Sequence, residues 1–344
     1  MSRSVLETIG IDITYNCNYR CKHCFNSSGT HNFAKEMTDE TLKQLVNDIS
    51  KLNLRGACIC GGEPLLRKKI LLEIIDLYKS SNPIQGFNMV SNGFYIDRQT
   101  AHDLKSAGIN SVQISLDGAT AETHNWLRNN TDAYEHAIKA IDFLVKSDID
   151  VSVACVPNKQ NFNEISELID LCQKLGVNRI RFQPLMSLGR GKNMEQYFLN
   201  DEEYFVLSRK LDSKRSSNSH IQIEWGDPIE HLFAYCSGFS GLKFIEISAY
   251  GDLLISPYLP LKLGNITRHN IFDYINAGLT DVLNNDFIRL ITSLITDAAK
   301  MDEQSRKVLP EIFTGNDISI DIIDENFSEK TLMFVQRYTK GETL

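Results

Sequence analysis

CNYRCKHC, residues 17–24, is the most informative stretch of this sequence, and it directly follows an apolar segment at residues 8–14. It places Cys17, Cys21 and Cys24 close together, whereas the remaining cysteines are scattered along the chain. Clustered thiolates bind zinc, copper(I) or iron–sulfur clusters. A structural zinc site usually takes four ligands in two separated pairs, and no fourth cysteine lies nearby. Three thiolates on one loop instead suit a four-iron cluster in which one iron has no protein ligand.

Two alternatives to an iron–sulfur cluster remain open for this loop. One is a zinc site completed by His23 or His31, and the other is three cysteines that share no ligand. The cluster is favoured because further polar motifs follow the neighbouring predicted strands, and a bare metal site does not need them.

Strands and helices alternate along the first 190 residues. Short segments rich in Ile and Val alternate with amphipathic ones, and KSAGINS and QKLGVNR each place a glycine between a helix and the next strand. Strict alternation predicts parallel strands, and six units are fewer than the eight of a complete barrel. We therefore predict an α/β fold, a partial (β/α)6 barrel of TIM type with a small α+β extension. The predicted strands are 8–14, 56–60, 87–91, 111–116, 150–156 and 179–184, and the predicted helices are 38–52, 67–81, 97–107, 132–147 and 161–175.

The pattern changes after about residue 190. Short strands joined by the hairpin-like turn AYGD are followed by helical patterns. We expect a core at 1–195, an extension at 196–284, and a helical region at 285–344 with a role in substrate binding. The predicted strands here are 221–225, 243–248 and 252–256, and the predicted helices are 200–214, 270–277, 280–296 and 302–313.

Composition excludes several functional classes. The net charge is −8, from 36 basic and 44 acidic side chains, and no basic run indicates nucleic-acid binding. No apolar stretch is long enough to span a membrane, and the first residues lack the pattern of a signal peptide. We expect a cytoplasmic protein whose cysteines are buried, metal-binding or catalytic.

Three motifs follow the second, third and fourth predicted strands. In GGEPLL the paired glycines Gly61 and Gly62 let the backbone approach a ligand closely, and Glu63 offers an acceptor for a ligand cation. SNG (residues 91–93) and SLDG (residues 115–118) offer short polar side chains suited to ribose hydroxyls or an amino-acid group. Each motif taken alone also fits an ordinary turn or helix cap.

The cysteine loop together with GGEP resembles the radical S-adenosylmethionine (SAM) superfamily, closely over residues 8–190 and loosely over 220–275. The resemblance implies that the three cysteines hold one [4Fe–4S] cluster whose open iron binds the amino and carboxylate groups of SAM. An external reductant of flavodoxin or ferredoxin type then supplies an electron. SAM is cleaved to a 5′-deoxyadenosyl radical that abstracts hydrogen from the substrate.

The same resemblance implies which residues contact SAM. GGE holds the amino group, and HNWLRNN resembles a stretch of peptide-modifying members that brings Arg128 to the carboxylate. A surface helix is the alternative for Arg128, and core packing is the alternative for Tyr19. The residues expected to bind SAM are Tyr19, Gly61, Gly62, Glu63, Ser91, Asn92, Ser115, Asp117, Arg128 and Gln183.

Residues 226–275 resemble the SPASM or twitch extension of peptide-maturing members of this superfamily. Cys236, a turn at Gly251 and the run 264–266 fit that outline, but Tyr258 follows Pro257 where the relatives have cysteine. No cysteine follows Cys236, and one thiolate cannot hold a second cluster. We therefore expect the extension without an auxiliary cluster.

Three further residues are candidates for catalysis. Cys60 and Cys236 are candidate hydrogen donors or substrate anchors, and Asp227 is a candidate base. Cys58 lies two residues before Cys60 and shares its strand face. The alternative for the cysteines is a small buried hydrophobic role, and for Asp227 it is a turn.

The expected function is that of a radical SAM enzyme acting on a peptide, with a ribosomally made precursor as the expected substrate. Crosslinking and epimerisation are the reaction types in view. A small-molecule substrate such as a sugar, nucleotide or cofactor precursor is the first alternative. A non-catalytic iron–sulfur or zinc protein is the second, and the GGEP and SLDG motifs argue against it.

Overall fold

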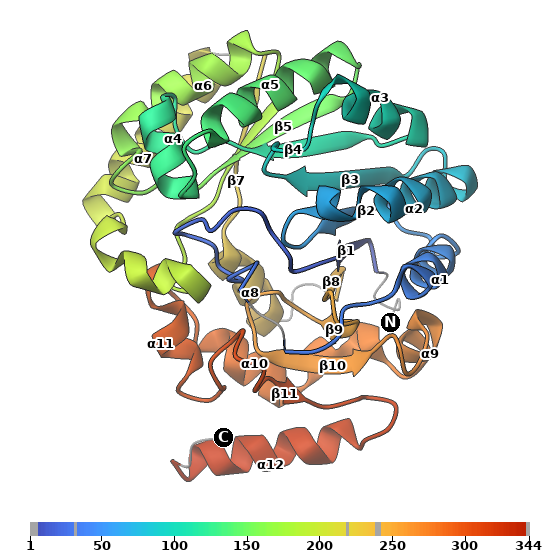
Figure 1. Ribbon diagram of the computed structural model, residues 1–344. Helices are drawn as coiled ribbons and strands as arrows, with labels where there is room; N and C mark the ends of the chain where they lie inside the picture. The colour runs from blue at the N-terminus through green and yellow to red at the C-terminus, as the bar shows by residue number, and fades with distance from the viewer. Residues whose placement is uncertain (1–5, 31–32, 218–219, 238–241, 342–344) are drawn as a thin grey trace.

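One mixed β-sheet forms the centre of the chain in the computed structural model, which describes residues 6–30, 33–217, 220–237 and 242–341. The strand order is β11-β10-β9-β8-β1-β2-β3-β4-β5-β6-β7, and every neighbouring pair from β8 to β7 is parallel. The sheet curves, and α1 to α7 lie along its outer side (Figure 1). The strands are β1 (Thr8–Asp12), β2 (Gly56–Cys60), β3 (Gly86–Ser91), β4 (Ser111–Ser115), β5 (Asp150–Cys155), β6 (Arg179–Phe182), β7 (Gln222–Trp225), β8 (Phe244–Ile247), β9 (Asp252–Leu254), β10 (Leu261–Asn265) and β11 (Ile318–Ser319).

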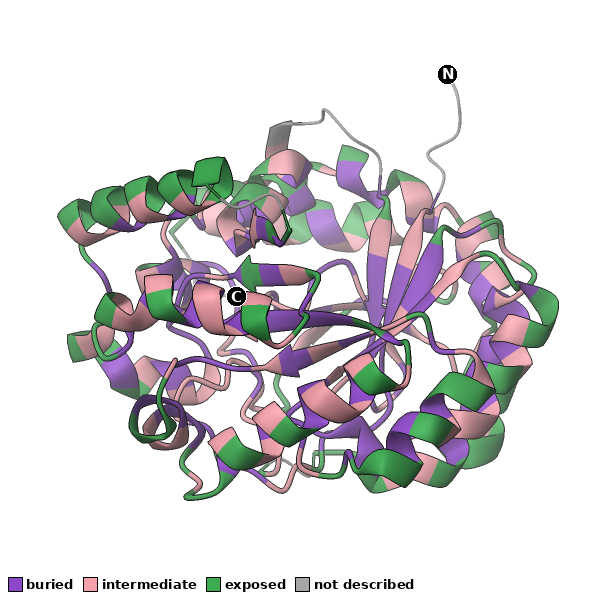
Figure 2. Cartoon of the chain, turned by 90° about the horizontal axis from the view of Figure 1, so that it is seen from above, coloured by how far each residue is buried: buried purple, intermediate pink, exposed green. Residues whose placement is uncertain are grey.

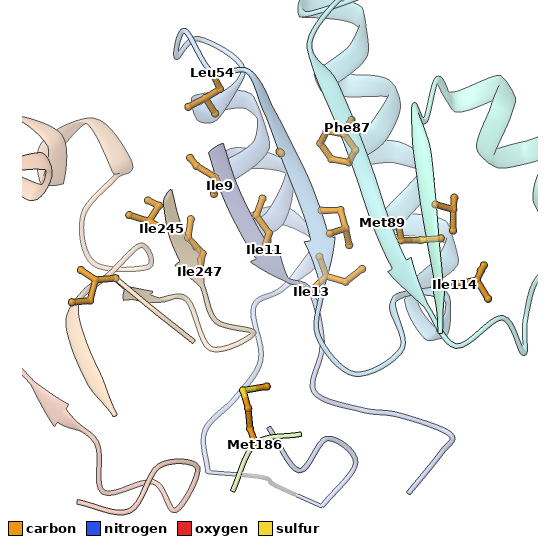
Figure 3. Packing of buried hydrophobic residues seen from close by; sticks show 14 of the residues in the cluster. Ile9, Ile11, Ile13, Leu54, Phe87, Met89, Ile114, Met186, Ile245 and Ile247 are labelled. Carbon is orange, nitrogen blue, oxygen red and sulfur yellow. The ribbon is translucent and has the colours of Figure 1, made fainter. Parts of the chain in front are cut away.

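Alternate residues of the parallel strands form an apolar outer face that the helices cover. Ile9, Ile11 and Ile13 are fully buried, and Figure 3 shows this row of side chains continuing through Phe87 and Met89 of β3. The helices are α1 (Asp39–Ile49), α2 (Lys68–Ser81), α3 (Arg98–Ala107), α4 (Ala121–Arg128), α5 (Ala133–Lys146), α6 (Ile165–Lys174), α7 (Asp201–Ser217), α8 (Pro228–Ser237), α9 (Ile271–Asn276), α10 (Asp286–Ser293), α11 (Met301–Ser305) and α12 (Phe327–Thr339), with short 3-10 segments at Pro64–Arg67, Phe162–Glu164, Gly189–Tyr197, Leu279–Asn284 and Ala298–Lys300.

The inner face of the same strands is polar and partly open to solvent. Register places Cys58 of β2 beside Asn88 of β3, and Arg181 of β6 beside Ala154 of β5. All four keep solvent exposure, whereas their outer-face neighbours are buried; Figure 2 shows this alternation along the strands. A complete barrel normally fills its interior with branched apolar side chains. This interior therefore differs from the apolar, filled interior of a complete barrel.

The predicted partial barrel is confirmed, and its six predicted strands pair in order. The sheet is longer than predicted, because β7 adds in parallel to β6 and β8 adds in parallel to β1. Strands from all three predicted segments, 1–195, 196–284 and 285–344, thus belong to one sheet. Such long-range pairing leaves no local signal in the sequence.

Local details differ from the predictions mainly in the second half. The predicted helix 280–296 is divided into a 3-10 segment and α10, because the side chain of Asn285 accepts a hydrogen bond from the Phe287 N–H at 2.9 Å and begins a new helix. The sequence interpretation did not include α4, α8, α12 or β10. Within the described residues, no helix has the length and apolar character needed to cross a membrane.

Candidate cluster and cofactor site

The three clustered cysteines follow β1 and gather at the carboxyl ends of the parallel strands. Cys21 packs with Tyr19 and Ala133 in one small buried group, against which Cys17 and Cys24 also pack. Chemistry in parallel α/β folds collects at this edge, because the βα loops meet there.

The loop that carries the cysteines is held in place by arginine side chains. Arg190 Nε donates to the Cys21 carbonyl at 2.7 Å, and its Nη1 donates to the Ser28 carbonyl at 3.0 Å. Arg20 donates to the Cys17 carbonyl at 2.6 Å. Cys24 Sγ is left to contact Asn26 Oδ1 at 3.1 Å. The arginines thus bind backbone carbonyls of the loop, while the three cysteines pack in one group.

Burial keeps two of these thiols protonated in the absence of a positive ligand. It raises the pKa of Cys21 to about 11 and also raises the pKa of Cys17. Within the cysteine loop, His23 has a pKa lowered to about 4 by burial, and its Nδ1 atom is buried with no hydrogen-bond partner. The other zinc candidate, His31, lies outside the described residues. A cationic metal centre would favour the thiolate forms that burial alone opposes.

Glu63 joins the GGE turn to the end of β3. Its Oε1 atom accepts from Ser91 Oγ at 2.9 Å, and its Oε2 atom accepts from the Asn92 N–H at 2.9 Å. Glu63 is completely buried, and burial raises its pKa to about 7. Among the described residues no cationic side chain pairs with it. A buried carboxyl group without a cation fits a ligand that brings an ammonium group.

The paired glycines before Glu63 allow two loops to lie in contact. An added Cβ atom at Gly62 would lie 2.0 Å from the Asn16 carbonyl oxygen, and one at Gly61 would lie 2.3 Å from that of Thr14. Gly61 also has a φ of 123°, a conformation that other residues rarely adopt. The GGE turn is therefore packed directly on the segment that leads into the cysteine loop.

Arg128 lies beside the cysteines and is anchored by the SLDG motif. Its Nε atom donates to Asp117 Oδ2 at 2.6 Å, and Nη1 lies 3.8 Å from Cys21 Sγ. Burial acts to raise the pKa of Asp117, but Arg128, His23, His124 and the Val156 N–H together outweigh burial and leave that pKa below its usual value. His124 accepts from the Asp117 N–H at 3.0 Å, and burial lowers its pKa to about 3. The motif therefore supplies a buried, neutralised ion pair that touches the cysteine group.

Taken together, these residues fit an iron–sulfur cluster with SAM. Three gathered thiols supply soft ligands, and Asn92 Nδ2 lies 3.9 Å from Cys17 Sγ as a further donor toward sulfur. The buried Tyr19 hydroxyl and Asn18 Nδ2 have no hydrogen-bond partner, which marks polar atoms that a ligand would satisfy. Asn18, Asp117 and His124 complete the polar surroundings.

The remaining predicted residues lie on the inner face of the strands or at α8. Cys58 and Cys60 face the interior with their sulfur atoms 3.5 Å apart. Gln183 follows β6 and is hydrogen-bonded to Tyr258, while Ser115 ends β4. The described structure does not place Asp227 or Cys236 among the cluster cysteines. Asp227 Oδ1 accepts from the Ile229 N–H at 2.8 Å and so caps α8, and Cys236 Sγ donates to the Phe233 carbonyl at 3.2 Å.

Sequence reasoning missed a carboxyl pair on the inner face. Glu246 of β8 donates a hydrogen bond to Asp12 of β1, and both side chains are buried. An added Cβ at Gly10 would lie 2.0 Å from Glu246 Oε2, so Gly10 makes room for this carboxyl group. Burial raises the pKa of Asp12 to about 7 and raises that of Glu246 well above its usual value. Single acidic residues alternating with Ile in GIDIT and FIEIS were the available signal.

Comparison with known proteins agrees with this geometry. The model of the Radical SAM superfamily matches residues 11–172. A probable GTP 3′,8-cyclase from Saccharolobus solfataricus is 31% identical over 260 residues, covering 72% of this chain and 82% of that protein. An AdoMet-dependent heme synthase from Methanosarcina barkeri is 25% identical over 75% of this chain and 78% of its own length. Mycofactocin maturase MftC from Mycolicibacterium smegmatis is 29% identical over 53% of this chain and 45% of its own length.

Solved structures show the same fold. Native anSMEcpe with bound AdoMet is superposed with a TM-score of 0.62 at 17% identity, covering 97% of this chain and 96% of that one. Streptococcus suis SuiB bound to S-adenosylmethionine has a TM-score of 0.66 at 16% identity, covering 83% and 68%. The motifs, the fold and the 31% identical relative agree, and the chain belongs to the radical SAM superfamily.

Proposed function

We propose that Cys17, Cys21 and Cys24 hold one [4Fe–4S] cluster and that SAM binds beside it. The observation that carries this proposal is the gathering of three thiols with the buried cation Arg128, next to a buried Glu63 that has no cationic partner in the described chain. When bound, the cluster and SAM supply hydrogen-atom abstraction from an unactivated carbon.

The chain's own residues orient and shield these groups. Arg128 and Asn92 direct N–H groups toward the cysteine sulfur atoms, and Glu63 ties the loops after β2 and β3 together. Tyr19 packs edge-to-face against Phe94 at 6.0 Å between ring centroids, and so covers one side of the cysteine group. We assign the SAM contacts to the predicted residues at this edge, with Gln183 the most distant along the sheet.

For the substrate we propose a peptide, namely a ribosomally made precursor. Support comes from the likeness of the C-terminal sequence to peptide-maturing extensions and from MftC, which is named a maturase. The second candidate is a small molecule, because the relatives matched over most of their length are named as a heme synthase and a GTP cyclase. An external one-electron reductant is required in either case.

Within this function, Cys60 is the proposed hydrogen donor to the substrate, with Cys236 and Asp227 as further proposed catalytic residues. Cys60 faces the barrel interior and its thiol is in contact with Cys58. We retain 1–195 as the core, 196–284 as the extension without a second cluster, and 285–344 as the region proposed for substrate contact.

Anaerobic reconstitution tests the central proposal. The chain supplied with iron and sulfide should bind about four irons and cleave SAM when reduced. Replacing all three loop cysteines with alanine should abolish both, whereas Cys172→Ala, a buried cysteine on α6, should abolish neither. Iron retained by the triple variant would refute the proposal.

The substrate is tested separately. Short peptides encoded beside the gene are incubated with the reconstituted enzyme, SAM and reductant, and mass spectrometry detects a change in peptide mass. Modification of such a peptide supports the first candidate. Full SAM cleavage without any peptide change would favour the small-molecule candidate.

A further inference from the structure

Arg181 is a cation on the inner wall of the barrel. It lies in β6 between Ile180 and Phe182, which are fully buried on the outer face. Because strand residues alternate between faces, the Arg181 side chain points into the interior. It is exposed there, so a molecule inside the barrel can reach it.

The residue best placed to neutralise Arg181 is paired elsewhere. Glu224 of β7 lies opposite Arg181 in the strand register, but it forms an ion pair with Arg179 at 3.2 Å. Within the described part of the chain, no hydrogen bond or ion pair involves the Arg181 guanidinium. This sets it apart from Arg128 and Arg190, which are fully engaged near the cysteines.

The local structure accommodates the Arg181 side chain without neutralising it. An added Cβ at Gly226 would lie 2.3 Å from Arg181 Nε, so the guanidinium crosses the backbone at the end of β7. Gly226 itself donates its N–H to the Phe182 carbonyl at 2.8 Å, which fixes that backbone against β6. The position of the cation is therefore built into the sheet edge.

The groups that face Arg181 are neutral. Burial raises the pKa of Tyr258 to about 12, and the same residue is hydrogen-bonded to Gln183. Burial and the charge of Arg181 lower the pKa of His231 on α8 to about 4, and its buried Nε2 atom has no hydrogen-bond partner. Each of these neighbours can form hydrogen bonds, but none compensates a positive charge.

The acidic groups inside the barrel do not compensate it either. Asp12 and Glu246 are hydrogen-bonded to each other. Burial raises the pKa values of both, and the neighbouring Asp12 raises that of Glu246 further. The charge of Arg181 is not among the causes of either pKa shift. The charge of Arg181 lowers the pKa of Cys58, but the hydrogen bond from Cys60 lowers it more strongly. An exposed and uncompensated cation on the inner wall attracts anions to it.

We propose that Arg181 binds a carboxylate of the substrate on the inner wall of the barrel, with Gln183 and Tyr258 as flanking hydrogen-bond groups. This proposal rests on the proposed function, since it places the substrate inside the barrel. The guanidinium fork matches a carboxylate with two parallel N–H···O bonds. A phosphate shares this oxyanion chemistry, and the experiment separates the two.

The test measures how fast phenylglyoxal, which modifies arginine, labels each arginine of the anaerobically reconstituted chain. Labelled peptides are quantified by mass spectrometry in sodium acetate, inorganic phosphate or chloride at equal ionic strength. Arg209, an exposed residue of α7, is the control. Acetate at about twice its dissociation constant should slow the labelling of Arg181 about threefold and saturably, and it should leave Arg209 unchanged.

Three outcomes would overturn the proposal. A carboxylate site is excluded if acetate slows the labelling of Arg181 no more than it slows the labelling of Arg209. Protection by phosphate without protection by acetate assigns the site to a phosphate-bearing ligand instead. Glu224→Gln should expose Arg179 to the reagent and leave Arg181 unchanged, so faster labelling of Arg181 in this variant would show that Glu224 already neutralises it. Reductive SAM cleavage is scored in the same preparation without anions, so its failure would refute the proposed function alone.

Discussion

Replacing Arg128 with methionine should strongly destabilise the folded chain. The Arg128 side chain is 9% exposed, and its Nε donates at 2.6 Å to Asp117, which is completely buried. Methionine keeps most of the side-chain volume but leaves the Asp117 carboxylate with the Val156 N–H as its principal remaining donor, at 3.0 Å. A charge left unpaired inside the protein costs far more than an exposed pair contributes.

The expected magnitude follows from burial. Removing one partner of a buried ion pair costs about 3–5 kcal/mol, whereas an exposed pair contributes about 0–1 kcal/mol. Arg179→Met, which breaks the half-exposed pair with Glu224, is the control and should cost less than about 1 kcal/mol. Adding Asp117→Asn to Arg128→Met should recover part of the loss, since the unpaired charge is then gone.

The same pair predicts a pH dependence with a definite sign. The pKa of Asp117 is lowered in the folded state, so its contribution is present above the unfolded pKa of about 4 and is lost as pH falls below that value. Urea unfolding of the metal-free chain, followed by circular dichroism under reducing conditions, measures each free energy of unfolding. A loss of unfolding free energy below about 1 kcal/mol for Arg128→Met would refute the reasoning. So would a double variant, Arg128→Met with Asp117→Asn, whose stability equals the sum of the two single effects.

Three further outcomes are expected. Gly62→Ala should lower the free energy of unfolding in urea by about 1–3 kcal/mol, because the added Cβ would lie 2.0 Å from the Asn16 carbonyl oxygen. Gly86→Ala should cost clearly less, because the atoms nearest to its added Cβ lie at 3.7 Å. Equal losses of stability in the two variants would contradict the packing argument. Asn92→Ala removes an N–H group directed at the Cys17 sulfur. The reduction potential of the reconstituted centre, measured by EPR-monitored titration, should therefore fall. An unchanged potential would exclude a hydrogen bond from Asn92 to the Cys17 sulfur. The pKa of Asp12 is raised to about 7 in the folded state, so the folded chain holds a proton that the unfolded chain releases. The free energy of unfolding should therefore decline as pH rises from about 4 through about 7. Asp12→Asn should flatten this decline, and urea unfolding measured across the same pH range checks it.

The part of the fold that could be predicted is the part that follows from local sequence patterns. A period of two residues marks strands and a period of 3.6 marks helices, so β1 to β6 and the helices between them were recognisable segment by segment. Capping chemistry is equally local. Thr38 accepts from the Thr41 N–H at 3.2 Å and begins α1, and Gly108 of KSAGINS ends α3 with a φ of 94°, as its place after a helix predicted.

Part of the candidate site was predictable for a related reason. The motifs that follow β1, β2, β3 and β4 must meet at one edge if the strands are parallel, so the neighbourhood of Cys21, Glu63 and Asp117 follows from topology alone. The detailed partners do not follow. Arg128 was expected at a ligand carboxylate, and the folded chain engages it with Asp117.

The order of strands and helices, the cysteine trio and the motifs at the strand ends can be recognised from the sequence, because each is written in a few neighbouring residues. Folding of the whole chain establishes that β8 pairs with β1 and that Glu246 thereby meets Asp12. It also pairs Glu224 with Arg179 and so leaves Arg181 uncompensated. These contacts join residues far apart in the chain, and their existence depends on strand register and side-chain direction. Neither is encoded in the local periodicity from which a sequence is read.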